Sequence, residues 1–381
     1  MTNGAYAVVV TSIGTADPQS AVSIARGLNL NVSDTVRALY RAPAVIASSL
    51  TDAVADALCS LLKGLGFEAD VRSGDPDAVL AAARAVAPAG AVDVPAAGAL
   101  LDVAVHVTDP ARFEAVCATV ARFCGVPPDE AARLLMAPPG IVLGSVSQAT
   151  ADALQARLAG LGASVAAAVP EQSRFMLLAA PLPPATAARL RAELAALGRD
   201  VPAGSTIVAS DLTHAEAARL WSGLGRTGQV RMVNTAFLRF DLLLEGLSPG
   251  AGWNATQAGA LERLFGVPAG LFEAIQGALP VRLAEAVDSA ALEAAMDELA
   301  DLGLRTRADL AGFMPLAVTV QAAPDWAAAG AVLDGLGIVT AAASGPQGTC
   351  LASGPVPALL ARVARARLEA LGADVTLAEA G

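Results

Sequence analysis

Apolar and polar side chains alternate along residues 49–71, SLTDAVADALCSLLKGLGFEADV, first with the spacing of a helix and then with that of a strand. The apolar positions of the first part share one helical stripe: Val54, Ala57, Leu58, Leu61, Leu62 and Leu65. Thr51 or Asp52 can cap the first turn, and Gly66 can supply a left-handed residue at the helix end. Residues 67–71 then alternate as a half-buried strand does. The stretch predicts a capped amphipathic helix that leads directly into a strand.

This pattern recurs three times, with Leu-x-x-Leu-Gly ahead of each strand, in residues 147–165, 288–306 and 357–375. A glycine is also expected to end the first helix of each repeat: Gly27, Gly125, Gly198, Gly266 and Gly337. The last four of these glycines are 73, 68 and 71 residues apart. Solenoid repeats have periods of about 20–50 residues, so each repeat here should close a core of its own. Because domains of this size are marginally stable alone, neighbouring repeats should also pack together.

The first repeat reads strand, helix, helix, strand, helix, strand, with helices expected to begin at Asp17-Pro18 and at Ser33-Asp34. We predict an α+β tandem array of about five β-α-α-β-α-β repeats with antiparallel three-stranded sheets. Repeats 3 and 5 are degenerate: repeat 3 lacks room for a second helix, and residues 340–357 of repeat 5 are expected to hold one strand and a loop. The expected divisions are residues 1–74 (repeat 1), 75–100 (a short helix and a Pro/Ala/Gly linker), 101–170 (repeat 2), 171–234 (repeat 3), 235–311 (repeat 4) and 312–381 (repeat 5). The strands that open the five repeats are expected at residues 5–11, 101–107, 175–180, 237–244 and 316–321.

Several residues of repeat 1 carry a resemblance to a known family: Val22, Arg26 and Gly27 in the first helix, Leu30 and Val32 before the second, Leu39, Ala42 and Pro43 before the second strand, and Leu65-Gly66 after the third helix. In these positions the repeat resembles the C-terminal domain of the bacterial ribosomal stalk protein and the related adaptor domain of the Clp protease. The resemblance implies the fold and a protein-binding role. The stalk domain presents lysines on its first two helices to recruit translation GTPases, and here those positions are Pro18, Ser23 and Ser33.

The composition excludes several classes of function. The net charge is −11, and Lys63 is the single lysine, so a basic surface for nucleic acid or anionic membranes is not expected. The least charged window, residues 335–361, is interrupted by glycines and prolines and cannot form a spanning helix. The N-terminal residues lack the pattern of a signal peptide, which favours a bacterial cytoplasmic location with reduced cysteines. Cys59 and Cys117 fall on apolar helix faces and are expected to be packing residues.

No catalytic, cofactor or metal motif is found. Residues 223–228, GLGRTG, fit G-x-G-x-x-G, but they follow a predicted helix and precede a strand, the reverse of a dinucleotide site. The two histidines, His106 and His214, are expected on a strand and near a helix start. We therefore expect no catalytic residue, no cofactor and no metal site.

The remaining candidates are protein-binding residues on the first two helices of the repeats, together with tryptophans near helix starts: Arg26, Arg37, Arg122, Arg133, Arg263, Trp253 and Trp326. Core packing is the other interpretation of the tryptophans. We expect a non-enzymatic protein-binding scaffold or accessory subunit, with self-association possible. The alternatives are an adaptor that presents proteins to a Clp-type protease or recruits a translation factor, and an enzyme with an unrecognised site between repeats.

Overall fold

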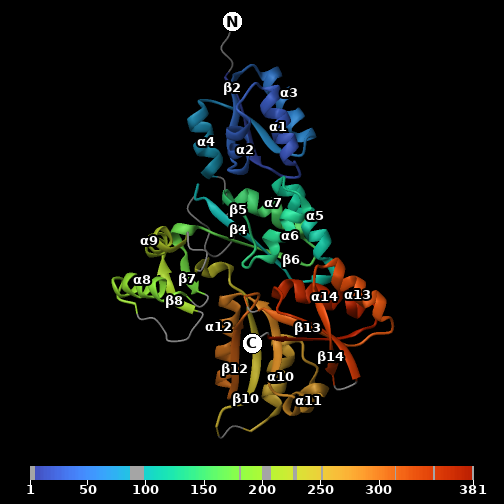
Figure 1. Cartoon of the computed structure of the whole chain (residues 1–381). Helices are drawn as coiled ribbons and strands as arrows, with labels where there is room; N and C mark the ends of the chain where they lie inside the picture. Colours follow the sequence, from blue (N-terminus) through green and yellow to red (C-terminus); the bar gives the residue numbers. More distant parts are fainter. Residues whose placement is uncertain are drawn as a thin grey trace. The chain divides into compact units, whose positions relative to one another are not determined.

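The computed structural model describes residues 5–85, 98–179, 182–199, 207–225, 230–249, 252–313, 315–345 and 348–379. The chain divides into two compact units, Met1–Gln172 and Ser173–Gly381, which are described separately below. Five small antiparallel sheets, each built from strands of one predicted repeat, alternate with helices along the chain (Figure 1). The predicted α+β class with repeated small sheets is confirmed.

Repeat 1 consists of β1 (Tyr6–Ser12), α1 (Pro18–Gly27), α2 (Val32–Tyr40), β2 (Ala44–Leu50), α3 (Asp52–Gly64) and β3 (Glu68–Ser73). The opening strand β1 lies in the middle of the sheet, in the order β2-β1-β3. Asp17 caps α1 by accepting a hydrogen bond from the Ser20 N–H at 2.8 Å, as the Asp-Pro pair predicted. The cap of α2 is Asn31, two residues before the position expected, because its side chain reaches the Asp34 N–H at 3.0 Å.

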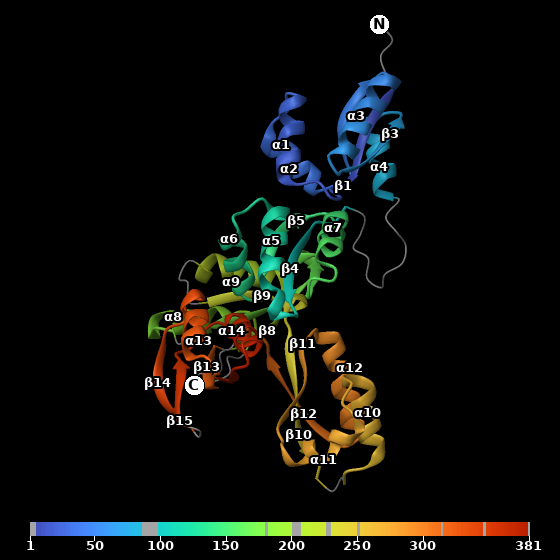
Figure 2. The same cartoon turned by 90° about the vertical axis from the view of Figure 1, so that its right-hand side faces the viewer.

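The helix predicted within the linker, α4 (Pro76–Ala85), is part of the core of repeat 1. Its Val79 and Ala83 pack against Ala7 and Val9 of β1. Because side chains alternate along a strand, Val8 and Val10 face the other side of the sheet, where α3 contacts β1 (Figure 2). Both faces of β1 are thus covered, which explains its continuous apolar run. The rest of the predicted linker, residues 86–97, lies outside the described residues.

Repeats 2 and 4 have the same plan, each with its opening strand in the middle of the sheet. Repeat 2 contains β4 (Leu101–Val107), α5 (Phe113–Cys124), α6 (Pro128–Met136), β5 (Ile141–Val146), α7 (Gln148–Leu158) and β6 (Ala163–Ala168). Repeat 4 contains β10 (Phe240–Leu247), α10 (Ala255–Phe265), α11 (Phe272–Gly277), β11 (Val281–Val287), α12 (Ser289–Asp301) and β12 (Leu304–Leu310).

Repeats 3 and 5 depart from this plan. Repeat 3 contains β7 (Arg174–Ala179), α8 (Pro184–Ala195), β8 (Ile207–Thr213), α9 (His214–Leu224) and β9 (Val230–Asn234). Repeat 5 contains β13 (Leu316–Ala322), α13 (Trp326–Gly335), β14 (Thr340–Gly345), β15 (Gly348–Ser353), α14 (Ala358–Ala370) and β16 (Asp374–Glu379). The middle of repeat 5 was predicted as one strand and a loop, and this was wrong. It forms a β14–β15 hairpin that makes the sheet four-stranded, in the order β14-β15-β13-β16.

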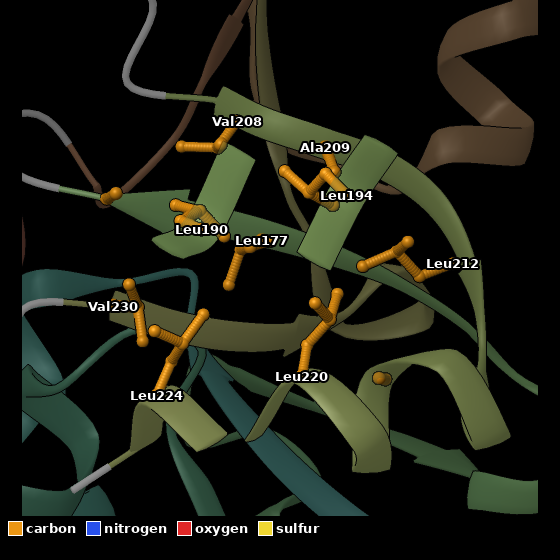
Figure 3. Packing of buried hydrophobic residues seen from close by; sticks show 11 residues of the cluster. Leu177, Leu190, Leu194, Val208, Ala209, Leu212, Leu220, Leu224 and Val230 are labelled. Carbon is orange, nitrogen blue, oxygen red and sulfur yellow. The ribbon is translucent and has the colours of Figure 1, made fainter. Parts of the chain in front are cut away.

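Repeat 3 buries leucines from both of its helices on one face of its sheet. Figure 3 shows Leu190 and Leu194 of α8 and Leu220 and Leu224 of α9 directed toward Leu177 of β7. The other face joins repeat 4, where Met176, Leu178 and Val233 of repeat 3 share a cluster with residues of and next to β10 and β12, namely Leu238, Phe240, Leu310 and Phe313. Repeats 3 and 4 therefore complete each other's cores, as their small size led us to expect.

A bulge recurs in the second strand of the first four repeats. The residue with positive φ is Ser49, Ser145, Asp211 or Ala286, and the register shifts near it in each pair of strands. In repeats 2 and 4 an aspartate of the opening strand accepts the N–H of that residue, Asp102 from Ser145 at 3.2 Å and Asp241 from Ala286 at 3.0 Å. The side chains at the bulge differ between repeats, so the sequence alone did not indicate it.

Candidate protein-binding surfaces

Repeats 1 and 2 bind each other within the N-terminal unit, and Tyr40 at the end of α2 is central to their contact. Its hydroxyl donates a hydrogen bond to the Phe123 carbonyl of α5, and the two rings meet edge to face with centroids 6.0 Å apart. Burial raises the pKa of Tyr40 well above its usual value, so the hydroxyl keeps its proton and remains a donor.

The N-terminus of α7 completes the contact from the other side of Tyr40. The Tyr40 carbonyl accepts hydrogen bonds from the Thr150 hydroxyl at 2.8 Å and from the Ser147 N–H at 3.1 Å. Thr150 is fully buried, with 0% of its surface exposed. A buried hydroxyl that has a partner in the neighbouring repeat fixes the register of the contact, because losing that partner leaves a polar group unsatisfied.

Arg157, further along α7, reaches the loop between β1 and α1. Its guanidinium donates to the carbonyls of Gly14 at 3.0 Å and Ala16 at 2.6 Å, and it lies 4.8 Å from the centroid of the Phe123 ring. Burial lowers the pKa of Arg157, and the neighbouring Tyr40 and Asp17 oppose this shift. The flank of α7 that carries Thr150 and Arg157 is therefore a binding surface for a domain of the same fold.

In the C-terminal unit an ion pair joins repeats 4 and 5. Arg362 of α14 donates to Asp241 of β10 at 2.7 Å, and both side chains are largely buried, with 13% and 8% exposed. Arg282 approaches the same carboxylate at 3.7 Å, and Glu285 lies 4.0 Å from Arg362. The carboxylate that supports the bulge in repeat 4 thus also receives a side chain from repeat 5.

The predicted arginines fall into two groups. Arg26 in α1 and Arg122 in α5 are exposed, their helices contact each other, and neither side chain makes an ion pair with another described residue. Arg37 pairs with Asp34 at 3.5 Å, Arg133 with Asp129 at 3.6 Å, and Arg263 with Glu298 of α12. All five lie on the first two helices of their repeats, and only the first two are left with an unneutralised charge among the described residues.

The predicted tryptophans also differ from each other. Trp253 is half-buried, packs edge to face on Phe272 with centroids 5.3 Å apart, and contacts the core of repeat 4. Trp326 stands in the first turn of α13 with 40% of its surface exposed. Of these two, Trp326 has the exposure that an interface residue needs.

Tyr40, Thr150 and Arg157 were not singled out from the sequence. Their contacts link residues 83 to 143 positions apart, and no local pattern reports such pairings. The sequence indicated one apolar stripe on the third helix of a repeat and no second contact surface. The structure shows that α7 has a second contact surface on its flank.

Comparisons with known proteins assign no relative: no family model matches the chain, and neither a curated protein nor a solved structure matches it. Within the residues that the structure describes, no group of three or more His, Cys, Asp and Glu side chains is placed to hold a metal ion. No helix in the described part of the chain is long and apolar enough to cross a membrane.

Proposed function

We propose that this protein is a non-enzymatic binding scaffold of the bacterial cytoplasm, whose repeats hold one another and present helical surfaces to a protein partner. The observation that carries the proposal is the contact between repeats 1 and 2, in which one domain recognises another of the same fold through side chains on its helices. The resemblance of repeat 1 to the ribosomal stalk domain supports the same role, because that domain also works by binding proteins.

The partner surface in this proposal is formed by α1 and α5. Arg26 and Arg122 are exposed there and make no ion pair with another described residue, although the chain as a whole carries a net charge of −11. Arginine binds carboxylates through two parallel hydrogen bonds, so the fitting partner has an acidic surface. The ion pairs within helices leave Arg37 and Arg133 less free to contribute.

The test uses the full chain as bait in a native lysate, with captured proteins identified by mass spectrometry and then purified for affinity measurement. We expect the variant Arg26→Glu/Arg122→Glu to bind the captured partner about 30-fold or more weakly, because loss of a close interfacial charge pair costs about 2–5 kcal/mol. Circular dichroism checks that the fold is retained.

Arg305→Glu is the matched control, since Arg305 is an exposed arginine on β12 of repeat 4 and belongs to the other compact unit. It should bind like the wild type. Equal affinity of the double variant and the control would remove α1 and α5 from the proposal. A reaction catalysed by the purified chain and lost in neither variant would contradict the scaffold role itself.

A further inference from the structure

The third helices of repeats 1 and 2 correspond residue by residue. The residues that precede the helices, Thr51 and Ser147, are 96 positions apart, and so are the glycines that follow them, Gly66 and Gly162. The inward positions agree: Ala55 and Leu62 of α3 are buried, as are their counterparts in α7, Ala151 and Leu158. The two helices can therefore be compared position by position.

In this alignment Val54 of α3 is equivalent to Thr150 of α7, and Leu61 is equivalent to Arg157. Thr150 and Arg157 are the two α7 side chains that bind repeat 1. In α7 this flank is covered. In α3 the same flank is exposed to solvent, with 52% of the surface of Val54 and 55% of that of Leu61 exposed. The predicted stripe included both residues, and for these two it was wrong. Leu62 of the stripe is buried, together with Ala55 and Cys59, which the stripe did not include.

The exposed flank of α3, defined here as Ala53, Val54, Ala57 and Leu61, carries no charge. At 3.6 residues per turn, Asp52, Asp56 and Lys63 lie about 115–155° around the helix from the middle of this flank. The counterparts of Leu61 in the third helices of repeats 2, 4 and 5 are all charged: Arg157, Glu298 and Arg367. Among repeats 1, 2, 4 and 5, an apolar residue at this position is thus particular to repeat 1.

The chemistry of the flank limits what can cover it. A loop such as residues 14–16, which offers carbonyl oxygens to Arg157, would find no donor on Val54 or Leu61 and would lose its hydrogen bonds on docking. The fitting surface is apolar, and the exposed flank of α3 is itself such a surface. With alanine at two of its four positions, two such helices can approach closely, and a two-fold axis makes one patch complementary to itself.

We infer that α3 of repeat 1 pairs with α3 of a second copy of this chain, so that Val54 and Leu61 become buried in a symmetric dimer. The helix flank that joins repeats inside the chain then joins chains to each other. This inference rests on the proposed function, because the second copy is one of the scaffold's protein partners. It adds a surface distinct from Arg26 and Arg122.

Sedimentation velocity of the full chain across a concentration series tests the inference. The wild type should show a concentration-dependent dimer. Leu61→Arg, which installs the residue found at this position in α7, should weaken dimerisation about 100-fold or more, because symmetry removes two buried leucines and brings two like charges together. Val339→Arg is the matched control, since Val339 is an apolar residue with 84% exposure outside α3, and it should dimerise like the wild type.

A cysteine pair gives a second measurement that does not depend on a destabilising change. Ala57 lies between Val54 and Leu61, near the expected axis, so Ala57→Cys should form a disulfide between copies under a mild oxidant that accepts the two electrons. Asp56→Cys, which lies about 100° around α3 from Ala57, should cross-link far less. A wild type that stays monomeric at all concentrations, or equal cross-linking of the two variants, would overturn the inference.

The two proposals fail separately. Loss of dimerisation in Leu61→Arg with normal capture of the acidic partner would support the α3 contact and leave the test of α1 and α5 unaffected. Normal dimerisation of Arg26→Glu/Arg122→Glu with unchanged partner affinity would count against the proposed partner surface alone.

Discussion

Replacing Arg157 by leucine gives repeat 2 the residue that repeat 1 has at the corresponding position of its third helix, and it should uncouple the two repeats. The change removes the hydrogen bonds to the carbonyls of Gly14 and Ala16, at 3.0 and 2.6 Å, and the contact with the Phe123 ring at 4.8 Å. The leucine side chain preserves much of the apolar packing. The loss is therefore mainly polar.

The expected cost to the coupling follows from the two hydrogen bonds, because the Phe123 ring belongs to repeat 2 itself. Hydrogen bonds from a charged donor contribute about 1.5–3 kcal/mol each. Two effects oppose this sum: the half-buried carbonyl of Gly14 can be hydrated once it is released, and ordering an arginine side chain costs about 2 kcal/mol. We expect a net loss of about 2–4 kcal/mol in the free energy that holds repeats 1 and 2 together.

Hydrogen exchange measured by mass spectrometry on the full chain reports this loss repeat by repeat. Peptides of both repeats in Arg157→Leu should exchange about 30-fold to 1000-fold faster than in the wild type, because each repeat loses the support of the other. All three tryptophans lie after residue 172, so tryptophan emission should show unchanged urea unfolding of the C-terminal unit. Arg133→Leu, which removes an exposed pair of 3.6 Å, should change little. Faster exchange confined to α7, with repeat 1 unaffected, would refute the coupling.

Two further outcomes test the cores. Leu158→Ala and Leu299→Ala each remove a side chain with 0% exposure from a third helix, and each should lower the free energy of unfolding by about 2–5 kcal/mol. Only Leu299→Ala should shift the unfolding reported by tryptophan emission, because all three tryptophans lie in the C-terminal unit. Unaltered thermal melts of both variants would contradict the helix faces assigned here. Burial raises the pKa of Cys117 to about 11 and of Cys124 to about 12, and it raises that of Tyr40 too, so the folded state holds these protons more tightly than the unfolded state. The stability that these groups contribute is fully present below their unfolded pKa values and is lost as the pH rises above them. The free energy of unfolding of the N-terminal unit, measured in urea, should therefore fall from about pH 9 upward. Cys124→Ala should show a smaller fall.

The helices and strands of this chain could largely be predicted because their caps and turns are local. Asp17 caps α1 and Gly266 ends α10 in the left-handed conformation, each where the sequence indicated. The inward face of α3 was misassigned for a physical reason. Leu, Val, Ala and Cys occupy more than half of its circumference, so apolarity alone does not distinguish the face against the sheet from the flank next to it.

The contacts between repeats could not be predicted in the same way. Thr150 is an ordinary helix residue in the sequence, and its burial depends on the carbonyl of Tyr40, 110 positions away. The hairpin of repeat 5 is a different case, since Gly345 at the end of β14 and Gly348 at the start of β15 are a recognisable turn signal. The candidate arginines were placed on the correct helices, but their exposure and ion pairs required the structure.

Asp241 has a role within its own repeat and also binds a side chain of the neighbouring repeat. Asp102 of repeat 2 and Asp241 of repeat 4 both accept the N–H of the bulge residue, so this carboxylate has a role inside a single repeat. In repeat 4 its second oxygen also receives Arg362 of repeat 5 at 2.7 Å, with 8% of the Asp241 side chain exposed. The charge of Asp241 is therefore paired with an arginine of the neighbouring repeat.

Removing Arg362 alone should lower the free energy of unfolding more than removing the charges of both Arg362 and Asp241. Arg362→Leu leaves a buried carboxylate with Arg282 only at 3.7 Å, and breaking a buried pair in this way costs about 3–5 kcal/mol. Asp241→Asn/Arg362→Leu should recover a large part of that cost, because the asparagine oxygen can still accept the Ala286 N–H while no charge remains buried. Urea unfolding followed by tryptophan emission measures both variants. Equal stability of the single and double variants would mean that Arg282 alone neutralises Asp241, and the ion pair could then not be what joins repeats 4 and 5.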